Sequence, residues 1–204
     1  PMTMTAVKVE RAPVGLRFWV LWMLATTAGL LVYTFASFPL MFFSQAIRVG
    51  DGGAASIVFG LVLSVIGGAL LGAAFGVGQW LVLRRELGRA GSWVLATILG
   101  YVVATILTSA IITELGWVAA IKGVLIYGGV LGIFQWYVLR GHIHRAEWWV
   151  AISVVAWGAG IILSNALFNE LPVPAVFFIT TAITGGGMVW LLRRRSPQTE
   201  APAA

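Results

Sequence analysis

The sequence contains no cysteine, only seven acidic residues and two histidines. The lack of cysteine excludes disulfides, thiolate metal sites, cysteine nucleophiles and palmitoylation. Charged residues make up 10% of the chain, whereas they make up about a quarter of an ordinary soluble domain. Together with a hydrophobic content of 60% and a mean hydropathy of +0.96, this scarcity of charge indicates a membrane protein.

Basic residues outnumber acidic ones, thirteen to seven. In a soluble protein such an excess favours a nucleic-acid partner, but here the basic residues lie between apolar segments, so we expect them to set the orientation in a bilayer and expect no nucleic acid. Two residues, Arg48 and Lys122, fall on one side of the predicted membrane. The opposite side holds Lys8, Arg11, Arg17, Arg84, Arg85, Arg89, Arg140, Arg145, Arg193, Arg194 and Arg195. Both termini are therefore predicted to be cytoplasmic.

Six apolar segments are each long enough to cross about 30 Å of hydrocarbon as a helix. They cover residues 16–38, 57–83, 93–113, 120–139, 148–168 and 174–192. Pro39 is expected to end or kink the first of them. The predicted fold is all-α, a polytopic membrane bundle over residues 16–195. Residues 1–15 are predicted to form a flexible basic leader and residues 196–204 a disordered tail.

The stretch 72–115 recurs 56 positions later as 128–171, with roughly sixteen identities over about 44 aligned positions. A fainter copy flanks this pair on each side. The sequence therefore predicts three tandem two-helix units, at about 16–85, 92–140 and 148–195. Since each unit begins and ends on the same side, the repeats are expected to be parallel and related by a pseudo-threefold axis along the membrane normal.

Both strong copies carry the run Gly-x-x-Gln-Trp-x-Val-Leu-Arg, at residues 76–84 and 132–140, followed by a short basic loop, an alanine and Trp-Val. This pattern resembles a group of bacterial multi-pass membrane proteins with no known activity, and the third unit departs from it at Val189. The topology is also similar to that of the mitochondrial carriers. Their Pro-x-acidic-x-x-basic motif is missing here, which leaves solute exchange without support from that likeness.

The second helix of each unit carries small residues at every fourth position, which places them on one helical face. Each stripe continues from two small residues to a tryptophan and an arginine: Gly72, Gly76, Trp80 and Arg84; Gly128, Gly132, Trp136 and Arg140; and Ala182, Gly186, Trp190 and Arg194. Gly68 extends the first stripe. Small faces allow close helix packing in lipid, so we expect these three helices to pack together at the centre of the bundle. Gln79 and Gln135 are expected to hydrogen-bond a neighbouring helix.

Tryptophans cluster near the predicted cytoplasmic ends of the helices. We expect them to act as interfacial anchors together with two snorkelling arginines: Trp80, Trp93, Trp136, Trp149, Trp190, Arg84 and Arg140. No cofactor is predicted, although a lipid, quinone or carotenoid stacked among these rings stays open. His142 and His144 lie in a loop without enough further ligands for a metal site.

Five polar residues are predicted near the outer surface: Glu114, Lys122, Asn165, Asn169 and Glu170. Glu114 and Glu170 occupy equivalent positions in the repeat. They are candidates for binding a cation or a basic partner, but a carboxylate in the headgroup layer costs little and needs no function. Both interpretations stay open at this stage.

Two functions are compatible with these patterns. The first is a non-catalytic subunit of the bacterial inner membrane that packs against membrane lipids and other integral membrane proteins. The second is a transporter or channel for small solutes or ions along the pseudo-threefold axis, with the outer polar residues at its mouth and Gln79 and Gln135 lower down. Charged residues or broken helices near the midplane would favour the second, and the sequence predicts neither.

Overall fold

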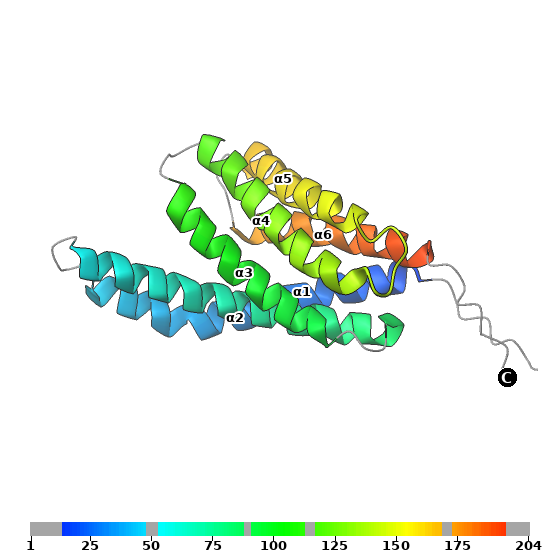
Figure 1. Cartoon of the computed structure of the whole chain (residues 1–204), viewed down its shortest axis with the longest axis horizontal. Coiled ribbons are helices and arrows are strands. Elements are labelled where there is room, and N and C mark those ends of the chain that lie inside the picture. Colours follow the sequence, from blue (N-terminus) through cyan, green and yellow to red (C-terminus); the bar gives the residue numbers. More distant parts are fainter. Residues whose placement is uncertain (1–13, 48–52, 88–90, 113–116, 169–172, 195–204) are drawn as a thin grey trace, which may run out of the picture.

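A computed structural model describes residues 14–47, 53–87, 91–112, 117–168 and 173–194, and all regular structure among them is helical. Six helices follow one another along the chain (Figure 1). They are α1 (Leu16–Ile47), α2 (Ala54–Leu87), α3 (Ser92–Ile111), α4 (Trp117–Leu139), α5 (Trp148–Phe168) and α6 (Val173–Arg193). The prediction of an all-α bundle of six helices is confirmed.

The helices form a closed ring in which each packs against the next one in sequence and α6 packs against α1. Among the described residues, the backbones of α2, α4 and α6 do not approach one another. The prediction that these three helices pack together at the centre is therefore wrong. The small faces of α2 and α4 pack instead against the helix that follows each of them in the chain.

Lengths differ sharply around the ring. With 32 and 34 residues, α1 and α2 exceed the other four helices, which have 20 to 23. At about 1.5 Å per residue α2 measures roughly 51 Å and α3 about 30 Å. Pro39 lies inside α1, which continues to Ile47, so the expectation that this proline would end the helix is wrong. Proline inside a helix is tolerated in membranes where other groups satisfy the freed carbonyl.

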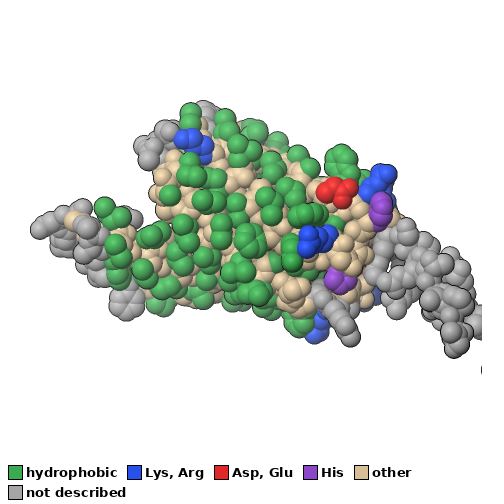
Figure 2. All heavy atoms as spheres, viewed as in Figure 1, with side chains coloured by type: hydrophobic (Ala, Val, Ile, Leu, Met, Phe, Trp, Pro, Cys, Tyr) green, Lys and Arg blue, Asp and Glu red, His purple; other side chains and the backbone are tan. Residues whose placement is uncertain are grey.

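Five helices are long and apolar enough to span a membrane, and α5 contributes a shorter apolar segment, Trp148–Leu163. Large apolar side chains are exposed over every helix, and Figure 2 shows them covering the middle of the visible face. A surface of this kind suits contact with lipid rather than water. The chain is therefore described as an integral membrane protein.

The first and last described residues lie at the same end of the bundle. There the Arg193 Nε donates a hydrogen bond of 2.6 Å to the backbone oxygen of Val14. We call this the basic end because seven arginines flank it, and Figure 2 shows most visible Lys and Arg side chains on that side. They are Arg17, Arg84, Arg85, Arg140, Arg145, Arg193 and Arg194. The predicted leader, apart from its last two residues, and the predicted tail lie outside the described residues.

Candidate functional site

Three tryptophans meet inside the ring near the basic end, one from each odd-numbered helix. Trp22, Trp93 and Trp149 are 0%, 0% and 1% exposed. Their ring centroids are 5.8 to 6.4 Å apart, and all three pairs are edge to face, the arrangement that aromatic quadrupoles favour. We call this group the tryptophan layer. Trp93 and Trp149 were predicted as interfacial anchors, and their burial by neighbouring helices shows that prediction to be wrong.

Glutamine side chains fix two of these rings in place. The Trp93 Nε1 donates to Gln79 Oε1 at 3.0 Å, and Trp149 Nε1 donates to Gln135 Oε1 at 2.9 Å. Gln135 Nε2 also donates to Thr97 Oγ1 at 3.1 Å, so this amide joins α4 to both α3 and α5. In a core without water each bond satisfies groups that would otherwise be costly to bury.

The third tryptophan has a different partner. Trp22 Nε1 donates to Thr184 Oγ1 of α6 at 3.4 Å, which is at the long limit of a hydrogen bond. The position on α6 that corresponds to Gln79 and Gln135 holds Val189, which packs against the apolar core. The contact between α6 and α1 therefore lacks the glutamine that the other two contacts share.

Four glycines of the predicted stripes lie directly against the backbone of the next helix. A Cβ on Gly72 would lie 2.7 Å from Ile98 Cα, and one on Gly128 would lie 2.7 Å from Val154 Cα. Gly76 and Gly132 face Val94 and Val150 in the same way, at 3.1 and 2.9 Å. Each contact thus recurs 56 residues later on both helices. Gly68 extends the first stripe, since its Cβ would lie 2.8 Å from Thr105 Oγ1.

Gly186 does not share this packing. It is exposed, and nothing lies within 4 Å of a Cβ placed on it. The neighbouring Gly185 and Gly187 make the close contacts instead, with Trp22 and Ile152. Gly186 lines an apolar groove of about 510 Å³ beside Trp148 and Trp190. The predicted stripe fails here because the side of α6 that packs on its neighbours is rotated away from Gly186.

Buried polar side chains form a second layer next to the tryptophans. They are Thr26, Gln79, Thr97, Gln135, Ser153, Thr180, Thr181 and Thr184. They line most of an internal cavity of about 40 Å³, enough for a water molecule or two. The far side of this cavity is lined by apolar and aromatic side chains, among them Phe75, Tyr101, Trp157 and Phe177. The polar groups are thus enclosed between two aromatic layers.

The remaining anchors lie at the basic end as arginine–aromatic pairs. The guanidinium carbon of Arg84 lies 5.1 Å from the Trp80 ring centre, and that of Arg194 lies 4.3 Å from Trp190. Arg140 lies 5.6 Å from Trp136 and 3.9 Å from Tyr137. These tryptophans are only partly buried. The same cation–π pair therefore occurs at the end of each even-numbered helix.

Most of the predicted outer polar residues lie outside the part of the chain that the structure describes. Glu114, Asn169 and Glu170 lie outside it, Asn165 belongs to α5, and Lys122 is half-buried on α4. Of the loop histidines, His142 places its Nδ1 3.1 Å from the Val138 carbonyl oxygen. Within the described ranges no three His, Asp or Glu side chains lie close enough to hold a metal ion.

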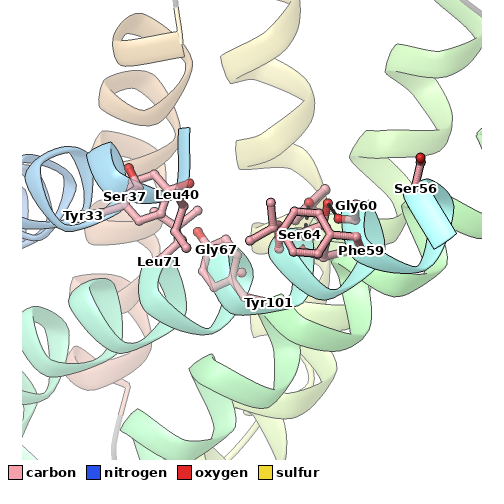
Figure 3. Close-up of a pocket in the computed structure, with 14 residues that line it drawn as sticks. Tyr33, Ser37, Leu40, Ser56, Phe59, Gly60, Ser64, Gly67, Leu71 and Tyr101 are labelled. Carbon is pink, nitrogen blue, oxygen red and sulfur yellow. Dashed lines mark hydrogen bonds between the residues drawn. The ribbon is translucent and has the colours of Figure 1, made fainter. Parts of the chain in front are cut away.

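A larger cavity, of about 650 Å³, opens away from the basic end between α1, α2, α3 and α4. Its lining residues are Tyr33, Ser37, Leu40, Ser56, Phe59, Gly60, Leu63, Ser64, Gly67, Gly68, Leu71, Tyr101, Thr105 and Tyr127. Seven of them carry a hydroxyl and none carries a charge. Figure 3 shows Tyr33 and Ser37 toward one end, Ser64 toward the other and Tyr101 between them. We call this the hydroxyl cavity.

Neither the buried polar layer nor the hydroxyl cavity was predicted from the sequence as a group of residues. The sequence does contain a repeated signal for the buried polar layer. Thr26, Thr97 and Ser153 each follow a tryptophan of the tryptophan layer by four residues and so share its helical face. The hydroxyl cavity left no such signal. Its residues come from four helices and lie largely outside the strong repeat, so only the three-dimensional arrangement brings them together.

Comparisons with protein families, with curated proteins and with solved structures found no match for this chain. The resemblance to bacterial multi-pass proteins through the Gly-x-x-Gln-Trp-x-Val-Leu-Arg run stays a prediction.

Proposed function

We propose that this protein is a non-catalytic subunit of the bacterial cytoplasmic membrane that packs against other integral membrane proteins and lipids. The observation that carries the proposal is the closed interior. The tryptophan layer fills the ring near the basic end, and every described buried polar atom in a side chain has a hydrogen-bond partner. A packed interior of this kind favours a rigid structural element over one that cycles between open states.

The proposal includes three parallel two-helix units with both termini in the cytoplasm. The recurrence of the glycine contacts and of the Gln–Trp bonds at an offset of 56 residues supports tandem units. The arginines gathered at the basic end support its assignment to the cytoplasm, because Lys and Arg are retained on that side during insertion. Fusing a reporter active only outside the cytoplasm to the C-terminus tests this; reporter activity would contradict the orientation.

The surface that a neighbouring subunit would cover lies on α1 and α2. These helices exceed α3 by twelve and fourteen residues and extend past the others in Figure 1. Their extra turns carry exposed apolar side chains, such as Phe38, Phe42 and Ile57. We call this part the α1–α2 arm. Because the apolar arm extends past the other described helices, it favours packing against a helix of another protein.

Photo-crosslinking in living cells tests the subunit role. A photoreactive phenylalanine analogue at Phe35 or Phe38 of the arm is compared with the same analogue at Leu95 or Leu125, which lie on α3 and α4 and are as exposed as Phe38. We expect discrete protein adducts from the arm positions and only lipid adducts from the controls. Recovery of the protein only as a solitary monomer in mild detergent, without arm adducts, would contradict the proposal.

A transporter along the ring axis is the second candidate, and the enclosed polar cavity is the observation that favours it. Flux of ions and small uncharged solutes into liposomes separates the two functions. Under our proposal the reconstituted protein gives no more flux than protein-free liposomes. Flux that is lost on substituting Gln135→Leu, in a variant that still folds, would establish transport instead.

A further inference from the structure

We propose that the hydroxyl cavity binds an uncharged lipid that carries both a free hydroxyl and ester groups, such as a diacylglycerol. This inference is independent of whether the protein is a subunit or a transporter. The cavity volume of about 650 Å³ falls within the range of about 300 to 1,000 Å³ of small-molecule sites. All of its lining residues belong to apolar segments long enough to span a membrane, so lipid is the solvent around it.

The cavity lining excludes a charged occupant. None of its side chains is charged, so a phosphate headgroup placed there would lose water without gaining a cation. The lining also differs from a simple acyl groove, because three tyrosines converge on it. The ring centres of Tyr101 and Tyr127 are 6.1 Å apart, and a Cβ on Gly67 would lie 3.8 Å from the Tyr33 hydroxyl. The occupant is therefore uncharged but polar.

Donors are available from the tyrosines. Tyr101 is 4% exposed and lines the cavity with its phenol side chain. Tyr127 and Thr105 share one hydrogen bond of 3.3 Å between their hydroxyl oxygens, which leaves one of the two protons for another acceptor. A carbonyl oxygen on the occupant would accept from these groups.

Acceptors are available from the serines. Ser64 Oγ donates its proton to the Gly60 carbonyl at 2.8 Å, and Ser37 Oγ donates to the Thr34 carbonyl at 3.2 Å. With its proton committed to the helix, each hydroxyl presents only lone pairs to the cavity. An occupant that donates as well as accepts would satisfy both the tyrosines and the serines. A quinone has carbonyl acceptors but no donor, whereas a diacylglycerol has ester carbonyls and one free hydroxyl.

Glycines keep the cavity open. Gly60 lines the cavity and nothing lies within 4 Å of a Cβ placed on it, so the substitution Gly60→Phe is chosen to introduce a phenyl ring at the cavity wall. Gly186 is the matched control, since it is also helical and equally unobstructed but lies on α6, away from the hydroxyl cavity. Comparing the two variants, Gly60→Phe and Gly186→Phe, separates loss of the binding site from a general effect of adding a phenyl ring to an exposed position on a helix.

Binding is measured with a fluorescent diacylglycerol in phosphatidylcholine nanodiscs, by competition with unlabelled dioleoylglycerol, a short-chain benzoquinone or dioleoylphosphatidylglycerol. We expect dioleoylglycerol to compete best, Gly60→Phe to weaken binding at least tenfold and Gly186→Phe to leave it unchanged. Equal binding to Gly60→Phe and wild type would overturn the proposal. Better competition by the quinone or by the anionic lipid would also overturn it.

The donor requirement is tested separately with small substitutions that keep the fold. Capping the free hydroxyl of the diacylglycerol as a methyl ether removes its donor, and we expect wild type to bind the ether about fivefold more weakly, as for one hydrogen bond. In the double variant Ser37→Ala and Ser64→Ala the two ligands should bind alike. An ether that binds wild type as well as the parent lipid would show that the serines do not accept from the ligand.

Discussion

The contacts between α2 and α3 and between α4 and α5 are built from equivalent residues, whereas the contact between α6 and α1 is not. In the first two a glutamine accepts from a tryptophan of the next helix and two glycines face its backbone. In the third a threonine accepts at 3.4 Å, and Gly185 faces the Trp22 and Trp19 side chains rather than a backbone. The first two join helices connected by a short stretch of chain, and the third joins helices from opposite ends of the sequence.

This difference shows that the ring can be closed between α6 and α1 by contacts other than the repeated Gln–Trp hydrogen bond. Two of the three equivalent helix contacts contain a Gln–Trp hydrogen bond, and the third, between α6 and α1, closes the ring without one. Trp19 helps there, since its Nε1 donates to the Ala182 carbonyl at 2.9 Å, and Arg193 bonds the backbone of Val14. Closure therefore depends on several contacts specific to this place, while the other two contacts share one design.

The largest expected effect comes from filling a glycine in a repeated contact. Gly72→Leu and Gly128→Leu each place a side chain within 2.7 Å of a backbone carbon, which cannot move without shifting a helix. We expect a loss of about 3 kcal/mol in unfolding free energy in mixed detergent micelles. Gly186→Leu is the control and should keep wild-type stability, because its surroundings are open. Equal losses at all three positions would remove the distinction between the contacts.

A smaller loss is expected from removing the glutamines. Gln135→Leu leaves the buried Trp149 Nε1 without an acceptor and also breaks the bond to Thr97, so we expect about 2 kcal/mol. Gln79→Leu breaks the bond to Trp93, and we expect about 1 kcal/mol. Unfolding followed by tryptophan fluorescence measures both. A larger loss for Gln79→Leu than for Gln135→Leu would contradict the assigned order.

Arginine–tryptophan pairs occur alike at the ends of α2, α4 and α6. Arg84→Gln and Arg194→Gln each remove a cation–π contact at a partly exposed site, so each should cost about 0.5 kcal/mol. The two variants should therefore be alike, unlike the glycine and glutamine variants. A clear difference in unfolding free energy between the two variants would show that the arginine–tryptophan pairs of α2 and α6 are not equivalent.

The smallest effect is expected at the third contact itself. Thr184→Val removes an acceptor that Trp22 reaches only at 3.4 Å, and the backbone oxygens that Thr184 bonds keep their helical partners. We expect a loss below about 0.5 kcal/mol. A loss as large as that of Gln135→Leu would show that Trp22 depends on Thr184 as strongly as Trp149 depends on Gln135.

Helix number and type were predictable from hydropathy, because each apolar segment matches the thickness of a bilayer and every backbone group in lipid must be paired within the helix. The extension of α1 past Pro39 was not predictable in this way, since proline alone does not show whether neighbouring groups compensate. The repeat singled out Gln79 and Gln135 because they recur. It gave no partner for them, since periodicity places residues on a face without stating which helix that face meets.

The central packing was misjudged for the same reason. The stripes on α2, α4 and α6 were assigned to one another, but those of α2 and α4 face the odd-numbered helix that follows, and Gly186 of α6 faces open space. Trp93 and Trp149 were assigned to the interface because tryptophan is enriched there, while their burial depends on three helices that meet only in space. The hydroxyl cavity required four helices to be placed before its chemistry was visible.

The bond from Arg193 to Val14 brings the two described ends of the chain within reach of each other. A ring whose described ends meet has no obligatory first helix. A circular permutant that joins residue 194 to residue 14 by a short linker, and begins instead at α3, should fold to the same ring. The architecture would then depend on the contacts around the ring and not on the order in which the helices are joined.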